Sequence, residues 1–159
     1  MAYRQSARTL AACCIVWGLA GCAVIEDRTG RVFSSRADAV VIIHNQALHG
    51  SVALAPDRTG TVDFSGGRGT IRSCFGSIRY SGTTTGRVDL HCDDGSEAVM
   101  PFTLLSATRG YAYSPSATEP ASLVFGLSNQ EARAYLAVPP GMRLVELPGR
   151  GFELQTVAQ

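Results

Sequence analysis

The sequence contains no lysine, so its 14 basic residues are all arginine, and they stand against 13 acidic residues. A formal net charge of +1 does not provide the concentrated basic face that a nucleic-acid platform needs. We therefore expect no nucleic-acid partner. The missing lysine itself fits a bias of genomic composition rather than a chemical requirement.

The sequence also lacks an apolar run long enough to cross a membrane as a helix, which takes about 20 residues. Its apolar run from Leu10 to Ala20 has the length of the h-region of a signal peptide, about 7–15 residues. Arg4 and Arg8 precede this run, and the first acidic residue is Glu26. This pattern predicts a cleaved export signal.

Four residues close the apolar run, Leu19-Ala20-Gly21-Cys22. They resemble the lipobox of bacterial lipoproteins at all four positions. The resemblance implies cleavage between Gly21 and Cys22, a diacylglycerol on the Cys22 thiol and acylation of the freed amine. Several acyl chains on one residue anchor a protein stably, whereas a single chain is marginal. An ordinary secretory signal, leaving Cys22 as a spare thiol, is the alternative.

Ala23 follows the cysteine, which by the same resemblance implies sorting to the outer membrane, with the protein facing the periplasm. The expected organisation is a signal peptide over residues 1–21, a polar tether over 22–36 and a single small β domain over 37–159. Loss of Arg4 and Arg8 with the signal changes the formal net charge from +1 to −1.

Of the five cysteines, two lie in the predicted signal and Cys22 carries the predicted lipid. Cys74 and Cys92 remain as an even pair in an oxidising compartment, and we expect a disulfide between them. A loop of this length stabilises a fold by roughly 3 kcal/mol on the chain-entropy model. The alternative is a metal site that includes His91, but the paired short spacings of zinc ligands are missing. We expect no metal and no cofactor.

The remaining chain shows short runs with alternating or β-branched apolar residues, which predict strands. Asp93-Asp94-Gly95 has the chemistry of a tight hairpin turn, and Pro101 suggests that its strand lies at an edge or is bulged. The strands are expected at 39–43, 51–55, 60–64, 77–80, 87–92, 98–104, 109–113 and 121–127, with 143–147 and 151–154 as final strands or an extended tail.

One short helix is predicted, because Ser128 and Glu131 have the spacing of a capping box. It should run over 129–138 and stop at Pro139-Pro140-Gly141. The fold class is therefore all-β with one short helix: an antiparallel sandwich, a curled meander or a partly open barrel.

No arrangement of residues predicts catalysis. Asp89 and His91 share one face of a strand, but the chain lacks the Gly-x-Ser-x-Gly turn that a serine nucleophile would need. We interpret both as solvent-facing residues of a hairpin. Arg109, Tyr111 and Tyr113 share another strand face, and their composition is that of an interaction surface. The alternative is that these tyrosines are edges of the core with wet hydroxyls.

Between Gly60 and Leu136 the chain is similar to small uncharacterised lipoproteins of Proteobacteria. The matching motifs are Cys74-Phe75-Gly76, Cys92-Asp93-Asp94-Gly95 and Phe125-Gly126-Leu127 before Glu131. These motifs are structural, so the resemblance implies a fold and a compartment but no activity.

The sequence thus predicts a non-enzymatic, lipid-anchored envelope protein that binds or supports envelope proteins or cell-wall glycan. A periplasmic inhibitor of lytic enzymes, similar to lysozyme inhibitors, is the alternative, and a cell-envelope hydrolase is a less favoured one.

Overall fold

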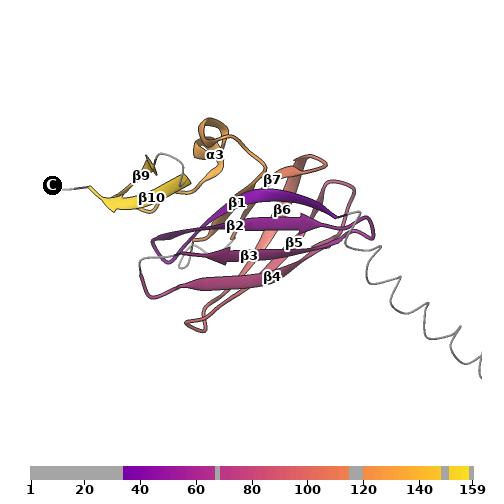
Figure 1. The fold of residues 1–159 in the computed structure, drawn as a ribbon, viewed down its shortest axis with the longest axis horizontal. Coiled ribbons are helices and arrows are strands. Elements are labelled where there is room, and N and C mark those ends of the chain that lie inside the picture. The colour runs from indigo at the N-terminus through magenta and orange to yellow at the C-terminus, as the bar shows by residue number, and fades with distance from the viewer. Residues whose placement is uncertain (1–33, 67–68, 115–119, 148–150, 158–159) are drawn as a thin grey trace, which may run out of the picture. The chain divides into compact units, whose positions relative to one another are not determined.

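The computed structural model describes residues 34–66, 69–114, 120–147 and 151–157. Within these residues, eight antiparallel strands follow one another around a closed barrel (Figure 1). β1 pairs with β2 along one edge and with β8 along the other, which closes the ring. The strands are β1 (Ser35–Ile43), β2 (Gln46–Leu54), β3 (Thr59–Ser65), β4 (Ser73–Tyr80), β5 (Thr85–Cys92), β6 (Glu97–Ser106), β7 (Arg109–Tyr113) and β8 (Ser122–Phe125).

The all-β fold with one short helix is confirmed, and the sheet curls until it closes completely. Each predicted strand is present, with bounds that differ by a few residues. β1 begins at Ser35, so Ser35 and Arg36, which the sequence pattern assigned to the tether, are part of the barrel. The predicted signal peptide, Cys22 and the tether up to residue 33 lie outside the described residues.

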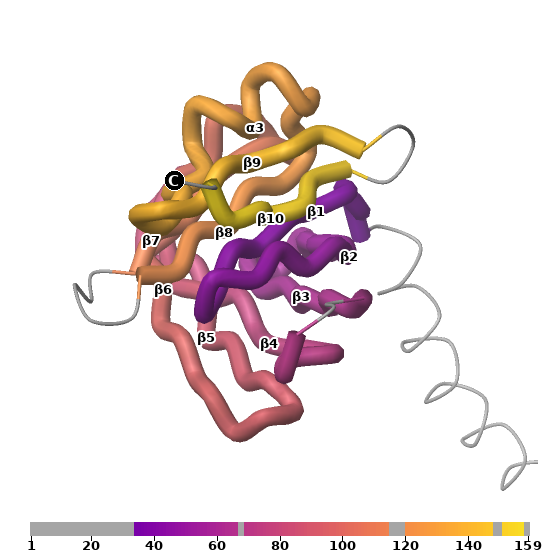
Figure 2. Tube along the Cα trace, turned by 90° about the vertical axis from the view of Figure 1, so that its left-hand side faces the viewer, coloured from indigo at the N-terminus to yellow at the C-terminus, as the bar shows by residue number. Residues whose placement is uncertain are grey.

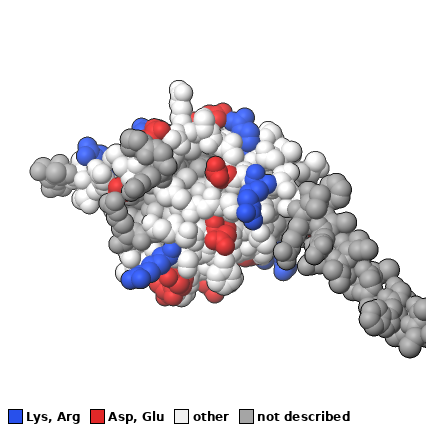
Figure 3. All heavy atoms as spheres, viewed as in Figure 1, with Lys and Arg blue, Asp and Glu red and all other residues white. Residues whose placement is uncertain are grey.

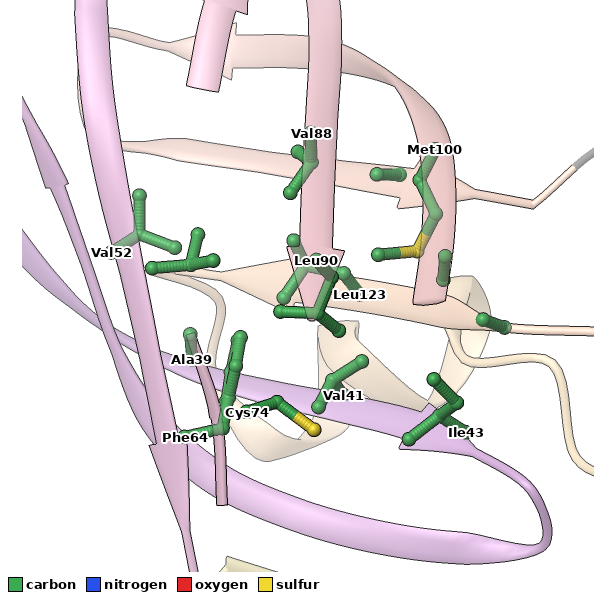
Figure 4. Packing of buried hydrophobic residues seen from close by; sticks show 14 of the residues in the cluster. Ala39, Val41, Ile43, Val52, Phe64, Cys74, Val88, Leu90, Met100 and Leu123 are labelled. Carbon is green, nitrogen blue, oxygen red and sulfur yellow. The ribbon is translucent and has the colours of Figure 1, made fainter. Parts of the chain in front are cut away.

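The barrel interior is filled with apolar side chains, because alternate residues of every strand point inward. Figure 4 shows these side chains converging from opposite walls of the barrel. Among the largest fully buried ones are Phe64, Phe125, Leu48, Ile78, Leu90, Met100 and Leu123. The interior is therefore a packed core.

Glycines occupy inward-facing positions on five strands, where the neighbouring backbone comes close. A Cβ built at each would lie 1.8–2.6 Å from a carbonyl oxygen of an adjacent strand. Since no real side chain tolerates such a contact, these glycines allow the strands to bend tightly enough for closure. They are Gly50, Gly60, Gly76, Gly86 and Gly110.

The predicted tight turn is present, and the strand that carries Pro101 is bulged but does not lie at an edge. Gly95 has a φ of +86°, as the tight turn after Asp93 and Asp94 requires. Pro101 lies opposite Arg87 of β5. Its strand β6 is bulged, between Leu104 and Ser106, but it is not an edge strand, because β5 and β7 pair with it on its two sides.

The helix α3 (Asn129–Tyr135) and a hairpin of β9 (Met142–Leu147) and β10 (Gly151–Thr156) cover one side of the barrel (Figure 2). The capping box of Ser128 and Glu131 is present as predicted. The helix ends three residues earlier than expected, because Leu136 is extended and the Ala137 N–H donates to the buried Ser122 Oγ at 2.9 Å. A second apolar cluster lies beneath this cover: Ile42, Val124, Ala132, Leu136 and Phe152.

Charged side chains are dispersed over the face seen in Figure 3, where most of the surface is uncharged. In the described ranges, no helix has the length and apolar character needed to cross a membrane.

Candidate interaction surfaces

The predicted interaction strip on β7 is joined by a residue of α3. Tyr111 and Tyr113 lie on the outer face of β7, with ring centroids 5.4 Å apart. The Tyr135 ring stacks on Tyr111 at 4.6 Å, with an interplanar angle of 21°. We call these three residues the tyrosine cluster. Tyr135 carried no sequence signal, because it reaches β7 only through the packing of α3 on the barrel.

Arg109 also connects β7 to α3, through an ion pair with Glu131 at the start of the helix. Glu131 also accepts hydrogen bonds from the Ser128 backbone N–H at 3.1 Å and from its hydroxyl at 2.7 Å. The hydrogen bond from the Ser128 side chain, followed by that from Arg109, lowers the pKa of Glu131 from 4.5 to about 2. Arg109 is therefore engaged inside the chain and helps to hold α3 on β7.

The tyrosine cluster is divided between internal packing and solvent. Tyr111 is half-buried and packs against the second apolar cluster together with Tyr135. Tyr113 is 37% exposed, and partial burial followed by the neighbouring Tyr111 and Tyr135 raises the pKa of its phenol. Its hydroxyl therefore stays protonated at neutral pH and can both donate and accept a hydrogen bond. Tyr111 therefore fits the alternative in which the tyrosines are edges of the core, whereas the interaction surface stays a prediction for Tyr113.

The residues considered for catalysis lie on the outer face of β5, as expected. His91 Nδ1 is 3.0 Å from Glu97 Oε1, and both side chains are largely exposed. Asp89 pairs instead with Arg87, at an Nε–Oδ1 distance of 3.0 Å. None of these residues lines either of the clefts described next.

In the part of the chain that the structure describes, two clefts flank the contact between β10 and the barrel, with volumes of about 390 Å³ and 360 Å³. His49 and Phe152 line both. The His49 Nε2–H donates to the Phe152 carbonyl at 2.7 Å, and the backbone of Gly151 lies against the imidazole. In the first cleft Gln46 Oε1 is buried without a hydrogen-bond partner. No local pattern could have indicated these contacts, since His49 and Phe152 are 103 residues apart.

The predicted disulfide joins Cys74 and Cys92, with an S–S distance of 2.00 Å. The two cysteines are directly opposite each other in the β4–β5 register and face the core. Among the described residues, no three His, Cys, Asp or Glu side chains gather in a way that could hold a metal ion.

Comparisons with models of known families, with curated proteins and with solved structures found no match to this chain.

Proposed function

We propose that this protein is a lipoprotein of the cell envelope, anchored in the outer membrane through Cys22 and facing the periplasm. Its barrel acts as a non-enzymatic binding or structural accessory for envelope proteins or cell-wall glycan. The lipobox at residues 19–22 supports the anchor. The tyrosine cluster is the observation that carries the binding role.

Tyrosine is a strong contact residue because its ring is large, loses little entropy on binding and carries a polar tip. The side chain of Tyr113 is partly exposed to solvent and could make such a contact. The Tyr111 ring lies beside that of Tyr113 and stacks on Tyr135, and the ion pair between Arg109 and Glu131 connects β7 to α3. A surface that is ordered before binding loses little entropy when a partner arrives.

The anchor is tested by Cys22→Ala in the full-length chain, followed by fractionation of cells. We expect an uncleaved or mislocalised precursor. Cys14→Ala, a second cysteine of the same segment, should be processed normally and serves as the control. A Cys22→Ala protein that still fractionates as a mature membrane protein would contradict the anchor.

The binding role is tested by placing a photo-crosslinking amino acid at Tyr113 in the native envelope. We expect a discrete adduct with an envelope protein, or retention on isolated cell-wall sacculi. The same group at Leu105, which is 47% exposed, is the control. Adducts that are the same from both positions, or from neither, would argue against the tyrosine cluster as a binding surface.

The second candidate function is inhibition of lytic enzymes, and the β4–β5 turn favours it. The backbone N–H groups of Ser81 and Gly82 both donate to the Thr85 carbonyl at 3.0 Å. Arg58, from the β2–β3 turn, donates to the Gly82 carbonyl and lies over the Tyr80 ring. A rigid exposed loop suits insertion into an enzyme cleft. Protein at micromolar concentration in a cell-wall lysis assay tests this function, and lysis at the unprotected rate would dismiss it.

A further inference from the structure

One side of β10 carries main-chain groups that no neighbouring strand uses. Among the described strands, β10 pairs with β9 alone, in a sheet of two strands. The Val157 N–H, just beyond β10, donates to the Gly141 carbonyl at 2.9 Å, on the β9 side. The Phe152 carbonyl points the other way, because it accepts from His49 of β2 at 2.7 Å. Successive residues of an antiparallel pair direct their main-chain groups to alternate sides, so the even-numbered residues of β10 face away from β9.

Leu154 lies in the middle of this free side. It is opposite Leu144 in the β9–β10 register and has the same phase as Phe152. Its N–H and carbonyl therefore point away from β9. In the described ranges, neither group makes a hydrogen bond on that side. A strand edge with unpaired donors and acceptors is a template for the pairing of another chain.

The free side of β10 borders the larger cleft, of about 390 Å³. Phe152 and Leu154 line this cleft from β10, and Gln46 and Ala47 line it from β2. Figure 2 shows β10 running beside β1 and β2, with β9 on its other side. The cleft volume falls in the range of about 300–1,000 Å³ that is usual for ligand sites. Ala47, Phe152 and Leu154 also belong to the second apolar cluster, so one wall of the cleft is apolar.

We propose that this cleft binds an extended peptide segment of another protein, which adds to β10 as a third strand. The Leu154 N–H donates to a carbonyl of the peptide, and the Leu154 carbonyl accepts from a peptide N–H. Such strand addition obtains its affinity from main-chain hydrogen bonds and its selectivity from the side chains on alternate positions. The site is separate from the tyrosine cluster, and it does not depend on the proposed anchor.

The cleft also indicates which side chain the peptide carries. Leu154 and Phe152 direct their side chains into the second apolar cluster. Residues that lie side by side on neighbouring strands project to the same face of a sheet. The peptide residue beside Leu154 therefore projects towards Ala47 and the apolar wall, and we expect it to be valine, isoleucine or leucine. The residues before and after it project to the opposite face.

The walls of the cleft favour a single extended chain over the edge of a second folded copy. β2 forms the facing wall, through Gln46 and Ala47. His49 closes one end, because its imidazole reaches the Phe152 carbonyl. A strand that belongs to a folded sheet brings its neighbouring strands with it, and this wall would obstruct them. An isolated segment needs only the spacing of one strand, about 4.8 Å.

Hydrogen exchange in the free, full-length protein tests the premise. The amides of Glu153 and Gln155 point towards β9 and should be protected, whereas the Leu154 amide between them should exchange faster. A Leu154 amide that is as well protected as its two neighbours would overturn the proposal, because its N–H would already be paired.

Random heptapeptides displayed on phage and selected on the full-length protein provide the probe for binding. A recovered peptide, once synthesised, should slow exchange of the Leu154 amide about tenfold or more, through the new hydrogen bond. N-methylation of the peptide should weaken binding at the nitrogen that faces β10, and not at the next nitrogen along the chain. Failure to recover a peptide that protects Leu154, or equal effects of methylation at neighbouring nitrogens, would exclude strand addition.

Leu154→Pro removes the edge N–H without removing a bond to β9, a setting in which strands tolerate proline. It should weaken binding of the selected peptide about tenfold. Leu144→Pro is the matched control, because Leu144 packs in the same apolar cluster and its N–H points away from β10. The control should bind as the wild type does. Equal weakening by the two prolines would overturn the proposal, and so would a dimer of the free protein that Leu154→Pro abolishes, which would assign the edge to a second copy.

Discussion

Gly86 of β5 lies directly opposite Phe102 of β6, and the phenylalanine ring occupies the space that a side chain on residue 86 would need. On the other side Gly86 is opposite Tyr80, whose ring meets Phe102 edge to face with centroids 5.1 Å apart. The two aromatic rings thus close over the glycine. The same pairing of an inward glycine with a phenylalanine occurs at Gly50–Phe64 and Gly110–Phe125.

Gly86→Ala should therefore destabilise the barrel. The new Cβ would lie 2.2 Å from the Arg79 carbonyl oxygen and 2.3 Å from a carbon of the Phe102 ring. Overpacking of a core costs about 1–3 kcal/mol, and here part of the obstruction is backbone that cannot turn aside. Urea denaturation should show a loss of at least about 2 kcal/mol.

The control for this change is Gly82→Ala. Its closest contact is the Thr85 hydroxyl, the end of a side chain that can rotate away. We expect its midpoint of denaturation to stay close to that of the wild type. If Gly86→Ala and Gly82→Ala both left the free energy of unfolding close to that of the wild type, the close contacts at Gly86 would not contribute to stability as argued.

Replacement of both Cys74 and Cys92 by serine should lower the free energy of unfolding by about 2–4 kcal/mol. The cross-link spans 18 residues, and both cysteines face the core. Urea denaturation of the variant and of the reduced wild type should give the same loss. A gel-shift thiol assay on protein isolated from cells provides an independent measurement, and free thiols at these positions would contradict the disulfide.

Phe152→Ala should release the C-terminal hairpin and leave the barrel folded. Phe152 is 2% exposed and packs in the second apolar cluster, with Arg133 lying over its ring. Truncation of a buried phenylalanine costs about 3–5 kcal/mol, and a two-stranded hairpin has little stability of its own. Hydrogen exchange should rise in β9 and β10 but not in β1–β6.

Phe75→Ala, which removes an exposed ring, is the matched control and should leave exchange in the hairpin unchanged. Uniformly faster exchange across the barrel in the Phe152 variant would mean that barrel and hairpin unfold as one unit.

Glu131 should make the attachment of α3 sensitive to acid. Because its pKa is lowered from 4.5 to about 2 in the folded protein, its contribution is complete above pH 4.5 and is lost as the pH falls towards 2. Exchange protection of α3 should decrease over that interval. In Glu131→Gln the decrease should be much smaller.

The cause of the low pKa can be tested by titration of the Glu131 carboxyl by NMR. Ser128→Ala and Arg109→Ala should each raise the pKa towards 4.5, because the hydrogen bond from the Ser128 side chain and then that from Arg109 lower it. A pKa that stays near 2 in either variant would contradict the role of the group removed.

The strands and turns of this protein could be predicted from the sequence, because the patterns that specify them span only a few residues. The alternation of Val88, Leu90 and Cys92 determines which face of β5 is buried, whatever the neighbouring strand. Gly95 in its turn and the capping box at Ser128 depend on contacts within a few residues. The disulfide followed from elimination among five cysteines, without any knowledge of the register.

Only the tertiary structure decided that the sheet closes, because closure requires β1 to pair with β8 across most of the chain. The local patterns were equally compatible with an antiparallel sandwich, a curled meander or a partly open barrel. The stacking of Tyr135 on Tyr111 and the hydrogen bond from His49 to Phe152 likewise depend on tertiary structure. Each depends on which distant strands become neighbours, and that choice is made by the packing of the whole barrel rather than by any single segment.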